Sequence, residues 1–209
     1  GMVPSVLRAN EDYFMFHEDI PLVSGTNKYE IPYRSIGNKT REIAYIDNNG
    51  NVFEMTRIMV EDLPDYNGSY QSQPYAYYIS NNEICLTPAN QNTQYAQGTI
   101  LRVTYYIRPN SLVLLKNVAP ITSIDRTTGE IQVSNLPSNY SANNKFDLVK
   151  VKSPHKCVKI ELTAVSLNST TKTVTFNIND IPPNLEVGDH VCIATESAIP
   201  QVPSDLHVM

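Results

Sequence analysis

The chain has 209 residues, 41% of them hydrophobic, which is enough apolar material to build a folded core. Its net charge of −5 argues against a surface for nucleic-acid phosphates, because such surfaces carry clustered basic side chains. No apolar run approaches the ~20 residues of a membrane span. We therefore expect neither direct recognition of nucleic-acid sequence nor a membrane partner.

The composition favours strands and turns over helices. The chain holds 13 tyrosines, no tryptophan and 14 prolines, and Asn, Ser and Thr dominate its polar residues. Aromatic and β-branched side chains pack well on a pleated sheet, whereas Asn, Ser and Pro favour turns. We predict an all-β protein: a hairpin-rich β body followed by a small, internally duplicated six-stranded barrel.

Residues 1–110 are predicted to form the first domain, a meander of hairpins. One hairpin joins Ile43–Ile46 to Val52–Ile58, and a second joins Tyr77–Ile79 to Ile84–Leu86. The first hairpin turns through Asp47–Asn51, which includes Asn49-Gly50, and the second turns through Asn81-Asn82. Asn and Gly tolerate the positive φ that tight hairpin turns require.

The clearest strand of the first domain is Thr99–Arg108, in which apolar and polar residues alternate. Successive side chains of a strand point to opposite faces of a sheet, so one face is predicted to meet the core and the other water. The core side holds Leu101, Val103, Tyr105 and Ile107, and the water side holds Arg102, Thr104 and Arg108.

Residues 111–196 are predicted to form the second domain, because a series of strand and turn signals occurs there twice at a spacing of about 41 to 45 residues. Two three-stranded units of this kind would close on each other as a six-stranded barrel, with Ile131 and Val174 at equivalent core sites. The first series is Ile121–Ile124, Ile131–Val133 and Phe146–Val149; the second is Leu162–Val165, Val174–Phe176 and Val187–Val191.

Residues 197–209 are predicted to begin a further segment that the chain does not complete. Ser204 is a good helix N-cap, but the chain ends within about one turn of it. We expect terminal helices that lie beyond the ends of this chain.

The sequence offers no catalytic constellation. It contains no H-E-x-x-H, no G-x-S-x-G and no glycine-rich phosphate loop, so we predict no catalytic residue, no cofactor and no metal. Cys85, Cys157 and Cys192 are dispersed over apolar strands, a pattern typical of buried, reduced thiols.

The best candidates for a contact surface lie in an irregular stretch between the hairpins. Asp65, Tyr66, Tyr70 and Tyr75 are predicted to be exposed there, and tyrosine combines apolar area with a polar tip, which suits protein interfaces or stacking on sugars. Two functions follow from this stretch: assembly with other proteins, or binding of a carbohydrate or surface by the Tyr-rich loop.

Short turn and strand motifs follow one another through nearly the whole chain. They are Asp12-Tyr-Phe14, Ile20-Pro-Leu-Val23, Tyr29-Glu-Ile-Pro32, Arg34-Ser-Ile-Gly37, Arg41-Glu-Ile43, Ile46-Asp-Asn-Asn-Gly-Asn51, Glu54-Met-Thr-Arg-Ile58, Glu61-Asp62, Ile84-Cys-Leu-Thr-Pro88, Leu101-Arg-Val-Thr-Tyr-Tyr106, Arg108-Pro109 and Ser197-Ala-Ile-Pro-Gln-Val-Pro203. In this order the chain resembles structural proteins of tailed bacteriophages of the head–tail connector or neck type. The resemblance implies a non-enzymatic virion protein, made in the bacterial cytoplasm, that binds other virion proteins and forms a homo-oligomeric ring in its full-length form.

Overall fold

The computed structural model describes residues 15–63, 73–88, 95–152 and 156–198. Strands dominate these residues, and the helical elements are short: the 3-10 turns η1 (Val60–Asp62), η2 (Leu115–Asn117) and η3 (Ile178–Asp180). The prediction of an all-β protein is confirmed. The chain divides into two compact units, Gly1–Arg108 and Pro109–Met209, and each is described by itself.

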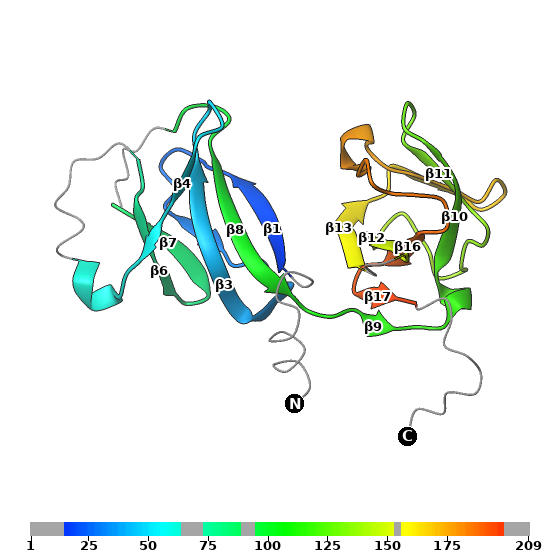
Figure 1. The fold of residues 1–209 in the computed structure, drawn as a ribbon, viewed down its shortest axis with the longest axis horizontal. Coiled ribbons are helices and arrows are strands. Elements are labelled where there is room, and N and C mark those ends of the chain that lie inside the picture. The colour runs from blue at the N-terminus through cyan, green and yellow to red at the C-terminus, as the bar shows by residue number, and fades with distance from the viewer. Residues whose placement is uncertain (1–14, 64–72, 89–94, 153–155, 199–209) are drawn as a thin grey trace, which may run out of the picture. The chain divides into compact units, whose positions relative to one another are not determined.

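The first unit contains two four-stranded sheets (Figure 1). In one sheet the strands follow the order β1-β8-β3-β4, and in the other β2-β7-β6-β5. The bounds are β1 (Met15–Pro21), β8 (Ile100–Ile107), β3 (Ser35–Ile46) and β4 (Val52–Glu54) for the first sheet, and β2 (Lys28–Glu30), β7 (Glu83–Thr87), β6 (Ala76–Ser80) and β5 (Thr56–Arg57) for the second.

The central strand β8 shows the predicted alternation. Leu101, Val103, Tyr105 and Ile107 are buried, and the residues between them are partly exposed. Its two neighbours, β1 and β3, both run antiparallel to it. Because β8 lies inside the sheet with one face against the core and the other nearer water, apolar and polar residues alternate along it with a period of two.

The predicted hairpin between β6 and β7 is also confirmed, with Ile79 opposite Ile84. Asn81 and Asn82 form its turn with φ of 51° and 66°. Two consecutive residues at positive φ give the turn whose twist matches that of the flanking strands, and Asn adopts this conformation readily.

The predicted strand Val52–Ile58 is wrong as a single strand. Val52–Glu54 pairs with β3 in one sheet, whereas Thr56–Arg57 pairs in parallel with β6 in the other. Met55 lies buried between the two stretches, and its N–H donates to the Ile43 carbonyl at 2.9 Å. The chain therefore turns a corner at Met55 and contributes an edge strand to each sheet.

The second unit is built around a seven-stranded sheet in the order β13-β12-β16-β10-β11-β15-β14, together with a two-stranded parallel sheet of β17 and β9 (Figure 1). The bounds are β9 (Ser111–Leu112), β10 (Ala119–Asp125), β11 (Glu130–Val133), β12 (Lys145–Lys150), β13 (Lys156–Thr163), β14 (Ser166–Asn168), β15 (Thr173–Thr175), β16 (His190–Ile193) and β17 (Glu196–Ser197).

The internal duplication is visible in the register of the hairpins. Ile124 pairs with Ile131 in the β10–β11 hairpin, and Leu167 pairs with Val174 in the β14–β15 hairpin, so each residue has its counterpart 43 positions later (124 + 43 = 167 and 131 + 43 = 174). Ile131 and Val174 are direct cross-strand partners and both are fully buried.

The turns repeat with the same spacing. The carboxylate of Asp125 accepts the N–H groups of Thr127 and Thr128, and the side chain of Asn168 accepts those of Thr170 and Thr171. A side-chain acceptor at the start of a turn organises the following N–H groups in this way.

The closed six-stranded barrel is wrong. The strand order has two ends, β13 and β14, and among the described residues no ladder joins them. The physical reason is that these two strands are consecutive in the chain. The segment pairs with β12 as β13, passes through Ala164 and Val165, and then pairs with β15 as β14. The two edges of the curled sheet are thus linked through the chain and not through paired strands.

The three thiols form no disulfide. Cys85 and Cys192 are buried, as predicted, whereas Cys157 is partly exposed. Burial raises the pKa of the Cys85 and Cys192 thiols. Cys157 and Cys192 lie on β13 and β16, the two strands that flank β12, so their backbones are two strand spacings, about 9.6 Å, apart. That exceeds the Cα separation that a disulfide allows.

Candidate interaction surfaces

The interface residues predicted from sequence are only partly described. Asp65, Tyr66 and Tyr70 lie outside the described residues. Tyr75 is partly buried, and its backbone is bound on both sides: its N–H donates to the Thr87 carbonyl at 3.2 Å, and its carbonyl accepts the Thr56 N–H at 3.2 Å. Tyr75 is therefore an extension of the sheet at its entry to β6, and not part of an irregular loop.

A first exposed apolar surface lies where the chain leaves the corner at Met55. Ile58 is buried, and its N–H donates to the Tyr77 carbonyl at 2.9 Å. The next residues, Met59 and Val60, are 72% and 52% exposed. Strand alternation explains this change, because Ile58 faces the core and the chain then turns outward into η1.

These exposed residues border a pocket of ≈ 510 Å³, which we call the corner pocket. Its volume lies within the ~300–1,000 Å³ that binding pockets usually occupy. Its walls come from the segment that leaves β5 and from the end of β6, and they include Arg57, Met59, Val60, Glu61, Tyr78 and Ile79.

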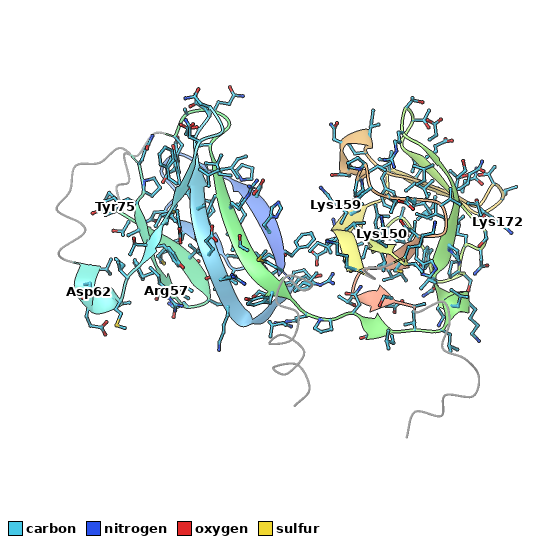
Figure 2. The ribbon with its side chains drawn as sticks, viewed as in Figure 1. Arg57, Asp62, Tyr75, Lys150, Lys159 and Lys172 are labelled. Atoms are coloured by element: carbon cyan, nitrogen blue, oxygen red, sulfur yellow. The ribbon has the colours of Figure 1, made fainter. Side chains whose placement is uncertain are left out.

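The lining of the corner pocket contains one acid and one base, Glu61 and Arg57. Glu61 lines the pocket, and Asp62 follows it in the first turn of η1; both side chains are exposed. Arg57 is the single cation of the lining. Figure 2 shows Arg57 and Asp62 on the same part of the first unit, at η1 and the strand that leads into it.

A second exposed apolar surface lies in the second unit, and we call it the leucine edge: Leu112, Leu114 and Leu115. These side chains are 68%, 65% and 43% exposed, whereas Val113 between them packs against the small core of Val118, Val149, Cys192 and Ala198. Three exposed leucines within four residues are unusual, because large apolar side chains on a protein surface are normally scattered.

Among the described residues, β9 pairs with a single strand, β17, so its other side has no partner strand there. The N–H of Ser111 donates to the Thr195 carbonyl at 2.7 Å, and that of Val113 donates to the Ser197 carbonyl at 2.9 Å. Because successive N–H groups of a strand point to opposite sides, the N–H of Leu112 points away from β17. The leucine edge therefore combines apolar side chains with an edge strand, the type of surface on which proteins associate.

A buried carboxylate holds this edge in place. Asp147 is fully buried, and its oxygens accept the N–H of Glu161 at 3.0 Å and that of Thr195 at 3.1 Å. The Asn110 amide, which immediately precedes β9, lies 3.3 Å from Asp147 and donates to the Glu196 carbonyl at 3.0 Å. Hydrogen bonds to a charged acceptor are stronger than neutral ones, so this network fixes β9 and β17 together.

The part of the chain that the structure describes shows neither a metal-binding cluster nor a membrane-spanning helix. It contains no group of three or more His, Cys, Asp or Glu side chains placed to hold a metal ion. Within the same residues, no helix has the length and apolar character needed to cross a bilayer.

Sequence reasoning missed both apolar surfaces. The signal for the leucine edge is the run Leu112–Leu115 after Pro109, but such a run reads equally well as a buried strand. Met59 and Val60 continue a segment that was expected to be one strand, so the corner that exposes them has no separate sequence signal.

A family model of the SU10 adaptor proteins matches residues 5–141, about two thirds of the chain. The match includes both the corner pocket and the leucine edge. The chain therefore belongs to the SU10 adaptor protein family, and it is a structural adaptor of phage type.

No curated protein matches the sequence. Among solved structures, the chain is similar to the crystal structure of the group B streptococcus pilus 2b backbone protein at 14% sequence identity. That match covers 87% of this chain and 68% of the other, with a TM-score of 0.19.

Proposed function

We propose that this protein is a head–tail connector or neck subunit of a tailed phage, which forms a homo-oligomeric ring, binds neighbouring virion proteins and works without catalysis. Membership of the adaptor family over residues 5–141 is the observation that carries the proposal. The two exposed apolar surfaces support it, because a subunit of a ring needs two different contact patches, one for each neighbour.

The alternative reading, a carbohydrate- or surface-binding module, required a solvent-open platform of tyrosines. Of the described tyrosines in that stretch, Tyr77 is buried and Tyr75 and Tyr78 are partly buried. No specific observation favours this alternative, so we do not propose it.

The test is the oligomeric state of the protein in the presence of its neighbouring virion proteins. Lasting ring contacts bury on the order of 1,000 Å² each, and the exposed apolar surfaces of this chain are small, so the chain alone is expected to be a monomer or weak oligomer. With the neighbouring virion proteins present, it should form closed rings in electron microscopy and light scattering. A protein that stays monomeric at high concentration, even with those neighbours, would refute the proposed function.

A further inference from the structure

We propose that the second unit contains a conformational latch, in which the buried carboxylate of Asp147 holds β9 and β17 together against strain in the backbone. The latch has two states. In the closed state β9 is paired with β17 and the leucine edge is fixed in place, and in the open state this pair has separated while the rest of the unit stays folded. The inference goes beyond the proposed function, because it concerns a local movement within the second unit.

Two residues that donate hydrogen bonds to Asp147 have a left-handed backbone. The φ angle is 58° at Glu161 and 75° at Thr195, although both residues carry a Cβ and Thr195 is β-branched. Such conformations are strained and persist only where the surrounding structure holds them. The Glu161 N–H donates to Oδ1 of Asp147 at 3.0 Å, and the Thr195 N–H donates to Oδ2 at 3.1 Å. One carboxylate therefore holds both strained segments.

The strained residue Thr195 also takes part in the pairing of β9 with β17, two strands that lie side by side (Figure 1). Its carbonyl accepts the Ser111 N–H at 2.7 Å. Asn110, directly before β9, donates a side-chain N–H to the same Oδ2 atom of Asp147 at 3.3 Å. If Thr195 relaxed to a negative φ, its carbonyl would turn away from Ser111, so loss of the carboxylate is expected to open the pair.

A second buried carboxylate of the same unit lacks this combination. Asp189 is fully buried and accepts the N–H groups of Val151 at 3.0 Å and Glu186 at 2.8 Å. Neither of these two donors is among the described residues with positive φ. Asp189 therefore holds backbone that has no left-handed strain to release, and it serves as the matched control for Asp147.

The experiment measures amide hydrogen exchange of the 209-residue chain by NMR. Ser111 and Val113 should share one opening constant, at least about tenfold larger than that of Phe176, whose N–H donates to a carbonyl of the β10–β11 turn. Asp147→Asn leaves only one acceptor oxygen. It should raise the opening constant of Ser111 and Val113 at least about tenfold more than that of Phe176, whereas Asp189→Asn should leave the ratio unchanged.

Two substitutions at Thr195 distinguish stored strain from a merely structural role of the carboxylate. Glycine adopts positive φ without steric cost, whereas alanine keeps the Cβ that causes the strain. The Thr195 side chain is exposed, so both changes remove little packing. In the Asp147→Asn background, Thr195→Gly should lower the opening constant of Ser111 and Val113 at least about threefold relative to Thr195→Ala.

Thiol labelling of the same two double variants gives an independent measure of the open state. Val113 packs against the small core that contains Cys192, so separation of β9 uncovers this thiol. The two variants carry the same charges. Cys192 should react at least about threefold more slowly in the variant with glycine than in the variant with alanine, whereas Cys85 of the first unit should react equally in both. Peptide mass spectrometry assigns the label to each thiol.

Three results would overturn the inference. The first is exchange of Ser111 and Val113 in the unmodified chain only together with Phe176, through unfolding of the whole unit. The second is an Asp147→Asn variant that changes all three amides equally, and the third is equal protection with glycine and alanine at position 195. If Asp147→Asn does not fold, the same glycine and alanine comparison in the otherwise unmodified chain decides the question, with the lower opening constant again expected for glycine.

Discussion

Replacing Gly129 by alanine is expected to destabilise the second unit strongly. Gly129 has φ of +79°, and a Cβ at this position would collide with the carbonyl oxygen of Phe176 and lie 3.3 Å from its carbonyl carbon. The obstacle is backbone, which cannot rotate aside as a flexible side chain could. The two backbone segments are also joined by a hydrogen bond, which the Phe176 N–H donates to the Gly129 carbonyl at 3.0 Å.

The magnitude follows from two contributions. Left-handed backbone costs about 1–2 kcal/mol for a residue with a Cβ. Relief of the clash must shift β15 away from the turn, and overpacking of this kind typically costs about 1–3 kcal/mol. We therefore expect Gly129→Ala to lower the free energy of unfolding of this unit by about 2–5 kcal/mol.

The duplication supplies a matched control at Lys172, the residue 43 positions later (129 + 43 = 172). It also has positive φ, 53°, and its carbonyl accepts the Val133 N–H at 3.0 Å, but it already carries a side chain. Lys172→Ala should change the stability by less than about 1 kcal/mol, because it removes only an exposed hydrogen bond from Lys172 to the Ser134 carbonyl.

The assay is urea unfolding followed by amide NMR signals of the second unit, because two units need not unfold in one transition. Equal stabilities of Gly129→Ala and Lys172→Ala, or a loss below 1 kcal/mol for Gly129→Ala, would refute the reasoning from the close approach of the two backbones.

The remaining predictions concern burial. Asp147→Ala removes a fully buried carboxylate that accepts two backbone N–H groups, and we expect a loss of about 2–4 kcal/mol in urea unfolding; an unchanged midpoint would contradict that role. Burial raises the pKa of Tyr95 from 10 to about 12, so its contribution to stability is present below pH 10 and lost as the pH rises towards 12. Thermal melts across this range should show the loss, and Tyr95→Phe should reduce it. Thiol reagents should label Cys157 in the native protein but Cys85 and Cys192 only after denaturation, and rapid native labelling of all three would contradict the structure.

Much of the local structure was readable in the sequence. The alternation from Leu101 to Ile107 predicts the buried face of β8, because strand geometry has a period of two residues wherever it occurs. The asparagines between Ile79 and Ile84 predict the tight hairpin for a similar reason, since few residues adopt positive φ readily. The repeat in the second unit was visible because turn residues recur in the same order.

The tertiary structure decided where each segment meets its neighbours. Val52–Ile58 has the pattern of one strand. In the fold its first part pairs with β3 and its second part with β6, in two different sheets, and the chain turns at Met55 between them. At the leucine edge, too, the local sequence does not determine which side chains are exposed. Leu112, Val113 and Leu114 are chemically alike, and only the pairing of β9 with β17 determines that Val113 packs inward while both leucines face water. The exposure of a residue depends on which segments, distant in the sequence, cover it in the fold. A local pattern of residues contains no information about those segments.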